Sequence, residues 1–188
     1  FNAENFSLLL DRELDRSELE ALSDREYHDM NLSIWNPNKE RPKIAAIART
    51  ILEHDFDLVT LCEIGGLETL DNFNGLYLAN RYDCFLYEEN SRRGIYVGAL
   101  LKKGRFPGAR AVNVEGEFSR NLLRLDLGSE GGNLQVFAVH LKSQRGEDRG
   151  IEFRVEEVKR LASMIPRRKA LVMGDFNGIL IRGMHQFE

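Results

Sequence analysis

Residues 170–177 have the sequence ALVMGDFN, a short apolar run that ends in Gly174, Asp175 and Asn177. An apolar run of this length bounded by turn residues is typical of a buried β-strand. Asp175 and Asn177 are two residues apart, so their side chains face the same side if the backbone stays extended. The stretch therefore predicts a buried strand that delivers two polar groups at its end.

Two earlier apolar runs carry polar groups at the same place. Residues 57–63 (DLVTLCE) end in Glu63, and residues 134–141 (LQVFAVHL) carry His140. Asn2 and Asn5 lie at the exit of a further strand that opens the chain. Because neighbouring strand ends form one rim of a sheet, where α/β proteins usually build their sites, we expect these side chains to meet.

The remaining pattern indicates an α/β fold of mixed sheets with helices packed outside them, because strands both alternate with helices and pair as hairpins. A surface insertion is expected at 6–30. Further strands are expected at 82–87, 95–101, 111–114 and 122–127, and helices at 42–54, 67–79 and 147–164. In the last helix we expect one apolar face formed by Phe153, Val158, Leu161 and Ala162.

Composition fits one ordinary globular domain of 188 residues, 43% hydrophobic and 30% charged. No apolar run is long enough to span a membrane. The net charge of −4 excludes a globally basic nucleic-acid binder. However, residues 1–60 carry 13 acidic and 7 basic side chains, so the remainder carries a net charge of +2 and has room for a local basic groove. Cys62 and Cys84 are too few for a disulfide scaffold and are expected to be small buried residues.

The polar groups at the rim suit phosphate chemistry. Glu63 and Asp175 supply hard oxygens, which favour Mg²⁺, with Mn²⁺ or Ca²⁺ as alternatives, and no Cys/His cluster has the spacing of a zinc site. A divalent cation neutralises charge that grows on a phosphate during attack, and a histidine near neutral pKa can move a proton. Each residue also has an ordinary structural use: a helix cap for Glu63, a turn for Asp175 and Asn177, and a satisfied sheet position for His140.

Five short motifs resemble those of the endonuclease/exonuclease/phosphatase superfamily. They are FNAEN at 1–5, DLVTLCE at 57–63, RGI at 93–95, FAVHLKS at 137–143 and GDFN at 174–177. They occur in the order of that superfamily and cover essentially the whole chain. The resemblance implies a four-layer, two-sheet α/β sandwich with its site at one rim.

The resemblance also implies a role for each candidate site residue. Glu63 would bind Mg²⁺ with Asn2 close to the metal or phosphate, and Asp175 would orient or activate the attacking water. Asn177 would contact the phosphate, and His140 resembles the first catalytic histidine of the deoxyribonuclease-like members. The candidate substrate-binding residues are Asn5, Arg93, Arg120 and Lys142.

The sequence departs from the superfamily pattern in several places. Cys62 stands where glutamine is usual, Gly65 and Gly66 where a further acidic residue is frequent, and Tyr96 where aspartate is common. The terminal Ser-Asp-His motif has no counterpart, and His185 is not assigned its role because no aspartate precedes it. We therefore expect residues 1–188 to form a single domain that is incomplete at both ends and lacks its C-terminal strands.

Three functions remain open from the sequence. The first is a Mg²⁺-dependent nuclease acting on DNA or RNA, favoured by the RGI and FAVHLKS motifs and by the basic residues Lys142, Arg145 and Arg149 after the His140 strand. The second is a phosphatase or phosphodiesterase acting on small-molecule or lipid headgroup phosphates, and the third is a non-catalytic binding module of the same fold. We expect a monomer whose partner is its nucleic-acid substrate.

Overall fold

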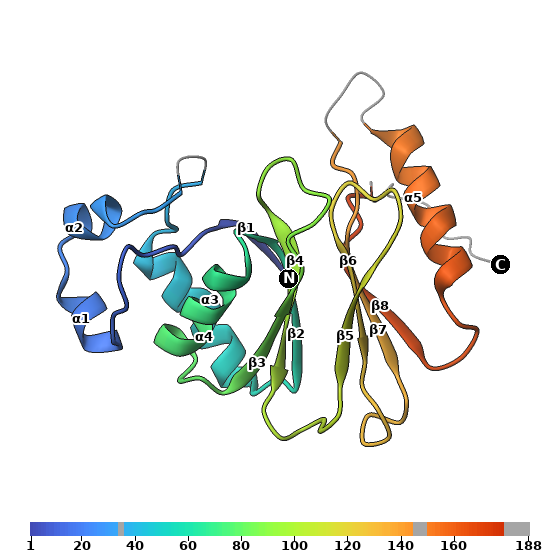
Figure 1. Cartoon of the computed structure of the whole chain (residues 1–188), viewed down its shortest axis with the longest axis horizontal. Helices are drawn as coiled ribbons and strands as arrows, with labels where there is room; N and C mark the ends of the chain where they lie inside the picture. The colour runs from blue at the N-terminus through green and yellow to red at the C-terminus, as the bar shows by residue number, and fades with distance from the viewer. Residues whose placement is uncertain (34–35, 145–149, 179–188) are drawn as a thin grey trace.

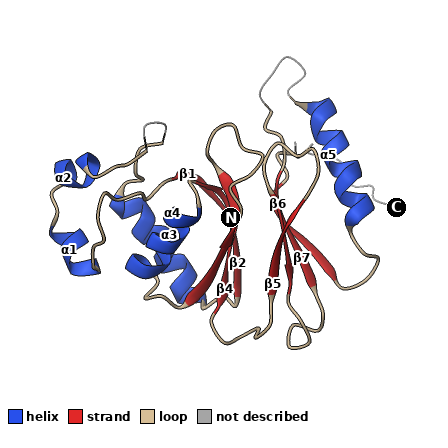
Figure 2. Cartoon of the chain, viewed as in Figure 1, coloured by secondary structure: helices blue, strands red, loops and turns tan. Residues whose placement is uncertain are grey.

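The chain folds into four layers, with two β-sheets face to face and helices on the outside of each. The structure is a computed structural model, and it describes residues 1–33, 36–144 and 150–178. Figures 1 and 2 show the two sheets in the centre, α3 and α4 beyond the first sheet, and α5 beyond the second. The α/β sandwich predicted from the sequence is therefore confirmed.

The first sheet has the strand order β1-β2-β4-β3, in which β1 and β2 are parallel and the other pairs antiparallel. Its strands are β1 (Asn2–Phe6), β2 (Leu58–Ile64), β3 (Tyr82–Leu86) and β4 (Tyr96–Lys102). Helices α3 (Arg41–His54) and α4 (Leu67–Tyr77) cover its outer face. The edge-to-face pair of Phe6 and Phe73, with ring centroids 5.0 Å apart, lies in the core beneath α4.

The second sheet has the order β5-β6-β7-β8, with two antiparallel pairs and a parallel pair between β7 and β8. Its strands are β5 (Arg110–Val114), β6 (Leu122–Asp126), β7 (Gln135–His140) and β8 (Ala170–Asp175). Helix α5 (Ile151–Met164) connects β7 to β8, as a parallel pair requires. The two parallel pairs place the exits of β1, β2, β7 and β8 at one end of the molecule.

The inner faces of the two sheets share one apolar layer and one polar clamp. Val97 and Ala99 of the first sheet pack with Leu125 and Val136 of the second. Within this layer the buried Asn121 side chain binds the backbone of Val97 twice, because Oδ1 accepts from the N–H at 2.7 Å and Nδ2 donates to the carbonyl at 2.8 Å. The clamp fixes β4 against the start of β6.

Helix α5 differs from the prediction in the face that it buries. Its buried residues are Arg154, Glu157 and Leu161, whereas Phe153 and Val158 are 44% and 46% exposed. Ala162 is exposed as well, so only Leu161 of the predicted apolar face is buried. Two charged side chains of this helix find backbone partners inside the protein and take the inner face. Residues 147–149, which the prediction included in this helix, lie outside the described residues.

The surface insertion contains two short helices, α1 (Arg16–Ala21) and α2 (Asp24–Asp29), each begun by a capping box at Asp15 or Ser23. Leu19 and Tyr27 anchor it in the core of the first sheet. Over the part of the chain that the structure describes, no helix is long and apolar enough to cross a membrane.

Candidate active site at the rim between the two sheets

Four predicted side chains converge at one rim, where β2, β7 and β8 end. Asn2 reaches this rim from the first residue of β1, and not from the exit of that strand as predicted. The Nδ2 atom of Asn2 donates to Oδ2 of Asp175 at 2.9 Å. The Nε2 atom of His140 lies 3.9 Å from Oε1 of Glu63 and 4.0 Å from Oδ2 of Asp175. Asn2 and Glu63 belong to the first sheet, and His140 and Asp175 to the second, so the site spans the gap between the sheets.

Irregular backbone aims the two side chains of the first sheet. The register between β2 and β4 shifts between Cys62 and Ile64, and Glu63 at this point has φ of 65°. A similar shift occurs in β1 before Phe6, where Asn5 has φ of 51°. The two irregularities meet, because the backbone N–H of Asn5 donates to Oε2 of Glu63 at 2.9 Å. Bulges of this kind re-aim side chains beside sites, and here they turn Glu63 toward the other sheet.

Asp175 is held by a turn rather than by extended backbone. Asn177 has φ of 48°, and its N–H donates to Oδ1 of Asp175 at 2.8 Å. Its side-chain Nδ2 donates to the carbonyl of Leu141 at 2.8 Å. The backbone is therefore not extended here, so the expectation that Asp175 and Asn177 face the same side does not apply. Asn177 instead connects the exits of β7 and β8.

The basic candidates flank the four converging side chains. Nη2 of Arg93 donates to Oδ1 of Asn5 at 3.1 Å, and the backbone of Asn5 in turn contacts Glu63. Asn5 therefore links Arg93 to Glu63. Arg120 is half-buried, its Nη1 donates to the carbonyl of Ser119 at 2.6 Å, and within the described residues its Nε atom has no hydrogen-bond partner. For Lys142 the backbone N–H donates to Glu157 at 2.6 Å. Arg145 and Arg149 lie outside the described residues, as does His185.

Burial and nearby charge set the protonation of the site. Burial lowers the pKa of His140, Arg120 lowers it further, and Asp175 and Glu63 only partly oppose them. Burial raises the pKa of Asp175, but hydrogen bonds from the Asn2 side chain and the Asn177 backbone outweigh it, so this pKa lies below its usual value. The site therefore favours a neutral imidazole beside an ionised carboxylate at neutral pH.

The donor set fits a hard divalent cation in kind. Glu63 and Asp175 present carboxylate oxygens around one nitrogen of His140. Among the described residues, no group of three or more His, Cys, Asp or Glu has the geometry of a metal centre. Mg²⁺ commonly uses one or two carboxylates and completes its shell with water and substrate phosphate. In Asn2, the second predicted metal-binding residue, Oδ1 accepts from the N–H of Glu4 at 2.9 Å.

Solved structures share this arrangement of layers. The D. rerio TDP2 structure with a single strand DNA product is 21% identical, with a TM-score of 0.51 over 72% of this chain and 54% of that one. A humanized D. rerio TDP2 carrying 14 mutations is 17% identical, with a TM-score of 0.50 over 72% and 58%. An endonuclease/exonuclease/phosphatase family protein from Bacteroides thetaiotaomicron is 16% identical, with a TM-score of 0.50 over 71% and 54%. The chain has the endonuclease/exonuclease/phosphatase fold.

The chain spans slightly more than half the length of these solved structures. No family model and no curated protein matches the sequence. Proteins of the endonuclease/exonuclease/phosphatase superfamily are typically metal-dependent. At these identities the likeness establishes the fold, which confirms the predicted resemblance at that level and leaves substrate and residue roles to be argued from the site.

Three residues that support the rim were not predicted as part of it. Asn121 clamps the two sheets, and Cys62 reaches across them with its Sγ 3.3 Å from the carbonyl of Val139. Glu157 is buried and binds two rim loops. One signal could have pointed to Glu157, which is its i, i+4 spacing to Leu161 on one helix face.

Proposed function

We propose that this chain is the core of a Mg²⁺-dependent phosphodiesterase that hydrolyses nucleic-acid backbones. The observation that carries the proposal is the convergence of Asn2, Glu63, His140 and Asp175 from four strands of two sheets. Such a combination of two carboxylates, an imidazole and an amide at one rim is difficult to explain by packing alone, because Asn2, Glu63 and Asp175 are not buried. We also propose that residues 1–188 form a single domain of this type.

Each residue has a role that its contacts support. Glu63 would hold the cation, which supplies charge neutralisation at a phosphate oxygen when it is bound. Asp175, kept ionised by its hydrogen bonds to Asn2 and Asn177, would accept a proton from the attacking water. The neutral His140 would donate a hydrogen bond through Nε2 to a phosphate oxygen. The 3.9 Å and 4.0 Å separations around Nε2 are too long for direct hydrogen bonds and leave these groups available to a substrate.

A nucleic-acid substrate is supported by the arginines beside the site. Arg93 and Arg120 flank Glu63 and His140, and guanidinium groups match phosphate geometry with two parallel donors. One protein of the same fold, D. rerio TDP2, has been solved with a single strand DNA product, which makes DNA the first substrate class to test. Phosphate contacts of this kind carry no base preference.

The test is cleavage of supercoiled plasmid by the purified chain, with Mg²⁺ and with excess EDTA. We expect nicking that needs Mg²⁺ and that is lost in Glu63→Gln, an isosteric change that removes the charge. The matched control is Glu53→Gln, an exposed position on α3, which is expected to nick like the unmodified chain.

Other outcomes would redirect the assignment. A folded chain that leaves plasmid intact but hydrolyses bis(p-nitrophenyl) phosphate in a Glu63-dependent way would replace the nuclease with a small-phosphoester enzyme. Failure to cleave either substrate would refute catalysis by this chain and favour the binding module.

A further inference from the structure

Helix α5 carries a fully buried carboxylate, that of Glu157, which contacts two loops of the rim. Glu157 is 0% exposed, and its two oxygens accept from the backbone N–H groups of Ser119 and Lys142, each at 2.6 Å. Hydrogen bonds to an ionised acceptor are short and strong, and a buried carboxylate is costly unless it is satisfied in this way. Leu161, one turn further along the same face, shows that this inner surface also accepts an apolar side chain.

The same helix holds the second side of the Lys142 peptide. Nη1 of Arg154 donates to the carbonyl of Lys142 at 2.8 Å, one turn before Glu157. Asn177 holds the preceding carbonyl, that of Leu141, at 2.8 Å. Three consecutive backbone groups after His140 are therefore fixed by side chains from α5 and from the exit of β8.

The other loop that Glu157 binds carries Arg120. Ser119 precedes Arg120, and the residue that follows, Asn121, is clamped to Val97 of the first sheet. The loop is thus anchored on both sides of Arg120. The charge of Arg120 is close enough to His140 and Glu63 to act on both, so its position is part of the site.

We propose that Glu157 is a positioning residue that fixes Arg120 relative to His140 through the backbones of Ser119 and Lys142, and so sets how the site grips a substrate phosphate. This inference rests on the proposed function of the rim. The carboxylate joins the loop before β6 to the loop after β7. Because β6 and β7 are antiparallel, these two loops lie side by side at the site. Helix α5 thus acts on the site through the loops that Glu157 and Arg154 hold.

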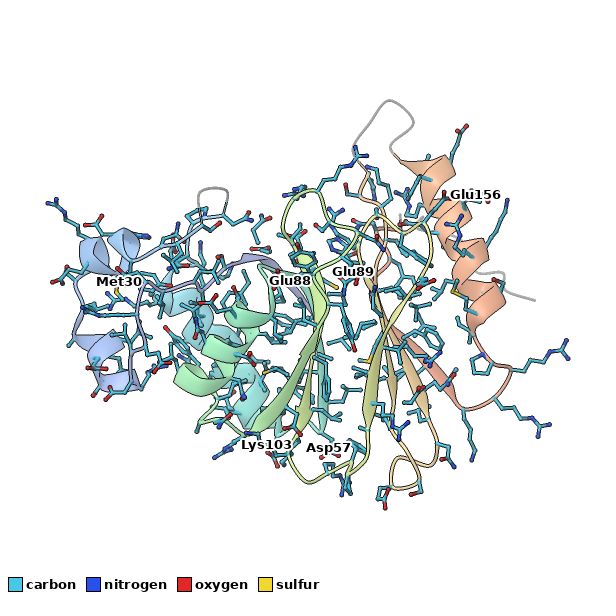
Figure 3. The ribbon with its side chains drawn as sticks, in the orientation of Figure 1. Met30, Asp57, Glu88, Glu89, Lys103 and Glu156 are labelled. Atoms are coloured by element: carbon cyan, nitrogen blue, oxygen red, sulfur yellow. The ribbon has the colours of Figure 1, made fainter. Side chains whose placement is uncertain are left out.

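The test compares Glu157→Gln with Glu156→Gln. Glu156, labelled on α5 in Figure 3, is the neighbouring glutamate, and its side chain is 60% exposed and forms an ion pair with Lys159. Glutamine keeps one carbonyl acceptor but turns an NH₂ group toward the second N–H donor. We therefore expect amide hydrogen exchange at Ser119 or Lys142 to become about tenfold faster or more in Glu157→Gln alone, since a hydrogen bond to a charged acceptor is lost.

The kinetic arm separates positioning from general stability. For Mg²⁺-dependent cleavage we expect Glu157→Gln to raise KM about tenfold while kcat changes much less, because Arg120 serves binding. The slope of log affinity for a single-stranded oligonucleotide against log salt should fall by about one when one phosphate contact is lost. A residue with only a packing role would lower the melting temperature and leave this split and this slope unchanged. Glu157→Asp, which keeps the charge on a shorter side chain, is the second variant and should fall between the glutamine variant and the unmodified chain.

Each failure has its own signature. Exchange at Ser119 and Lys142 that matches the Glu156→Gln control would overturn the tether. Faster exchange with unchanged KM and salt slope would overturn the positioning role and leave a structural clamp. An unmodified chain that cleaves no phosphodiester would refute the proposed function, and the positioning role with it, while the exchange data would still report on the tether.

Discussion

Replacing Asn121 by alanine is expected to weaken the contact between the two sheets more than any other single amide truncation in the described core. Asn121 is 1% exposed and Val97 is 0% exposed, so water does not replace the two lost hydrogen bonds easily. The pairing of β4 with β3 ends at Gly98, one residue from Val97, and Asn121 provides Val97 with the partners that a strand would give. Leaving one buried backbone group unpaired costs about 1–3 kcal/mol, so two such groups predict a loss of about 2–6 kcal/mol.

Urea unfolding measures this loss directly. A change of about 3 kcal/mol divided by an m-value of about 1–3 kcal/mol per molar shifts the midpoint by about 1 M or more. Asn113→Ala is the control, because Asn113 is half-buried and its amide donates one hydrogen bond, to the exposed Glu89, so its removal should cost about 1 kcal/mol or less. A midpoint for Asn121→Ala that coincides with this control would refute the reasoning.

The aspartate variant sharpens the same test. Asn121→Asp retains an acceptor for the Val97 N–H, but its ionised carboxylate faces the Val97 carbonyl without a proton between them. Burial raises the folded-state pKa of such a group above its unfolded value, so the folded state binds more protons and the stability is greatest at low pH and is lost as pH rises. We expect the stability gap between Asn121→Asp and the unmodified chain to narrow as pH falls, because a protonated carboxyl restores both hydrogen bonds. A gap that does not change with pH would contradict this account.

Three further predictions follow from contacts at or near the rim. Gly174→Ala should lower the free energy of unfolding by about 2 kcal/mol or more in urea titrations, because an added Cβ would lie 1.9 Å from a β7 carbonyl oxygen at a φ of 139°. Burial raises the pKa of Cys62 to about 11 and of Cys84 to about 12, so iodoacetamide at pH 8 should label neither thiol in the folded chain and both in denaturant. Asn2→Ala removes a hydrogen bond that lowers the pKa of Asp175, so the acid limb of the kcat/KM profile should move to higher pH; an unmoved limb would argue against Asp175 as the group that accepts the proton.

The strands and the convergence of their ends could be predicted because both depend on local pattern. The apolar runs at 57–63 and 170–177 are short and bounded by turn residues, which indicates strands. Both strands are present, but only β2 is buried as predicted, because no residue of β8 is buried and its Leu171 is 44% exposed. The parallel relation of β1 with β2 and of β7 with β8 then brings Glu63 and Asp175 to one end. Local sequence patterns were therefore enough to predict which residues form the candidate site and at which end of the strands they lie.

The backbone irregularities and the polar contacts inside the protein could not be predicted in the same way. The left-handed conformation of Glu63 arises from a register shift against β4, which depends on a strand more than thirty residues away. Helical periodicity placed Phe153 and Val158 inside, yet Glu157 lies inside because two backbone N–H groups of distant loops meet it there. Patterns of hydrophobicity indicate which residues are buried because they are apolar. They do not indicate which polar residues are buried because distant backbone groups hydrogen-bond to them.

The site and the sheet interface depend on the same contacts, which has a consequence for activity. Asn2 and Asp175 lie on different sheets and are joined by a 2.9 Å hydrogen bond, so a shift of one sheet against the other acts directly on the carboxylate. Because a displacement of about 1 Å can cost about a hundredfold in rate, loosening the Asn121 clamp should lower kcat/KM well beyond the small fraction of chain that it unfolds. Cleavage assays under conditions where Asn121→Ala remains folded by circular dichroism test this expectation. Full activity in that variant would show that the rim keeps its geometry without the clamp, and that the contacts between Asn2, Asp175 and the two strand exits suffice to hold the sheets in place.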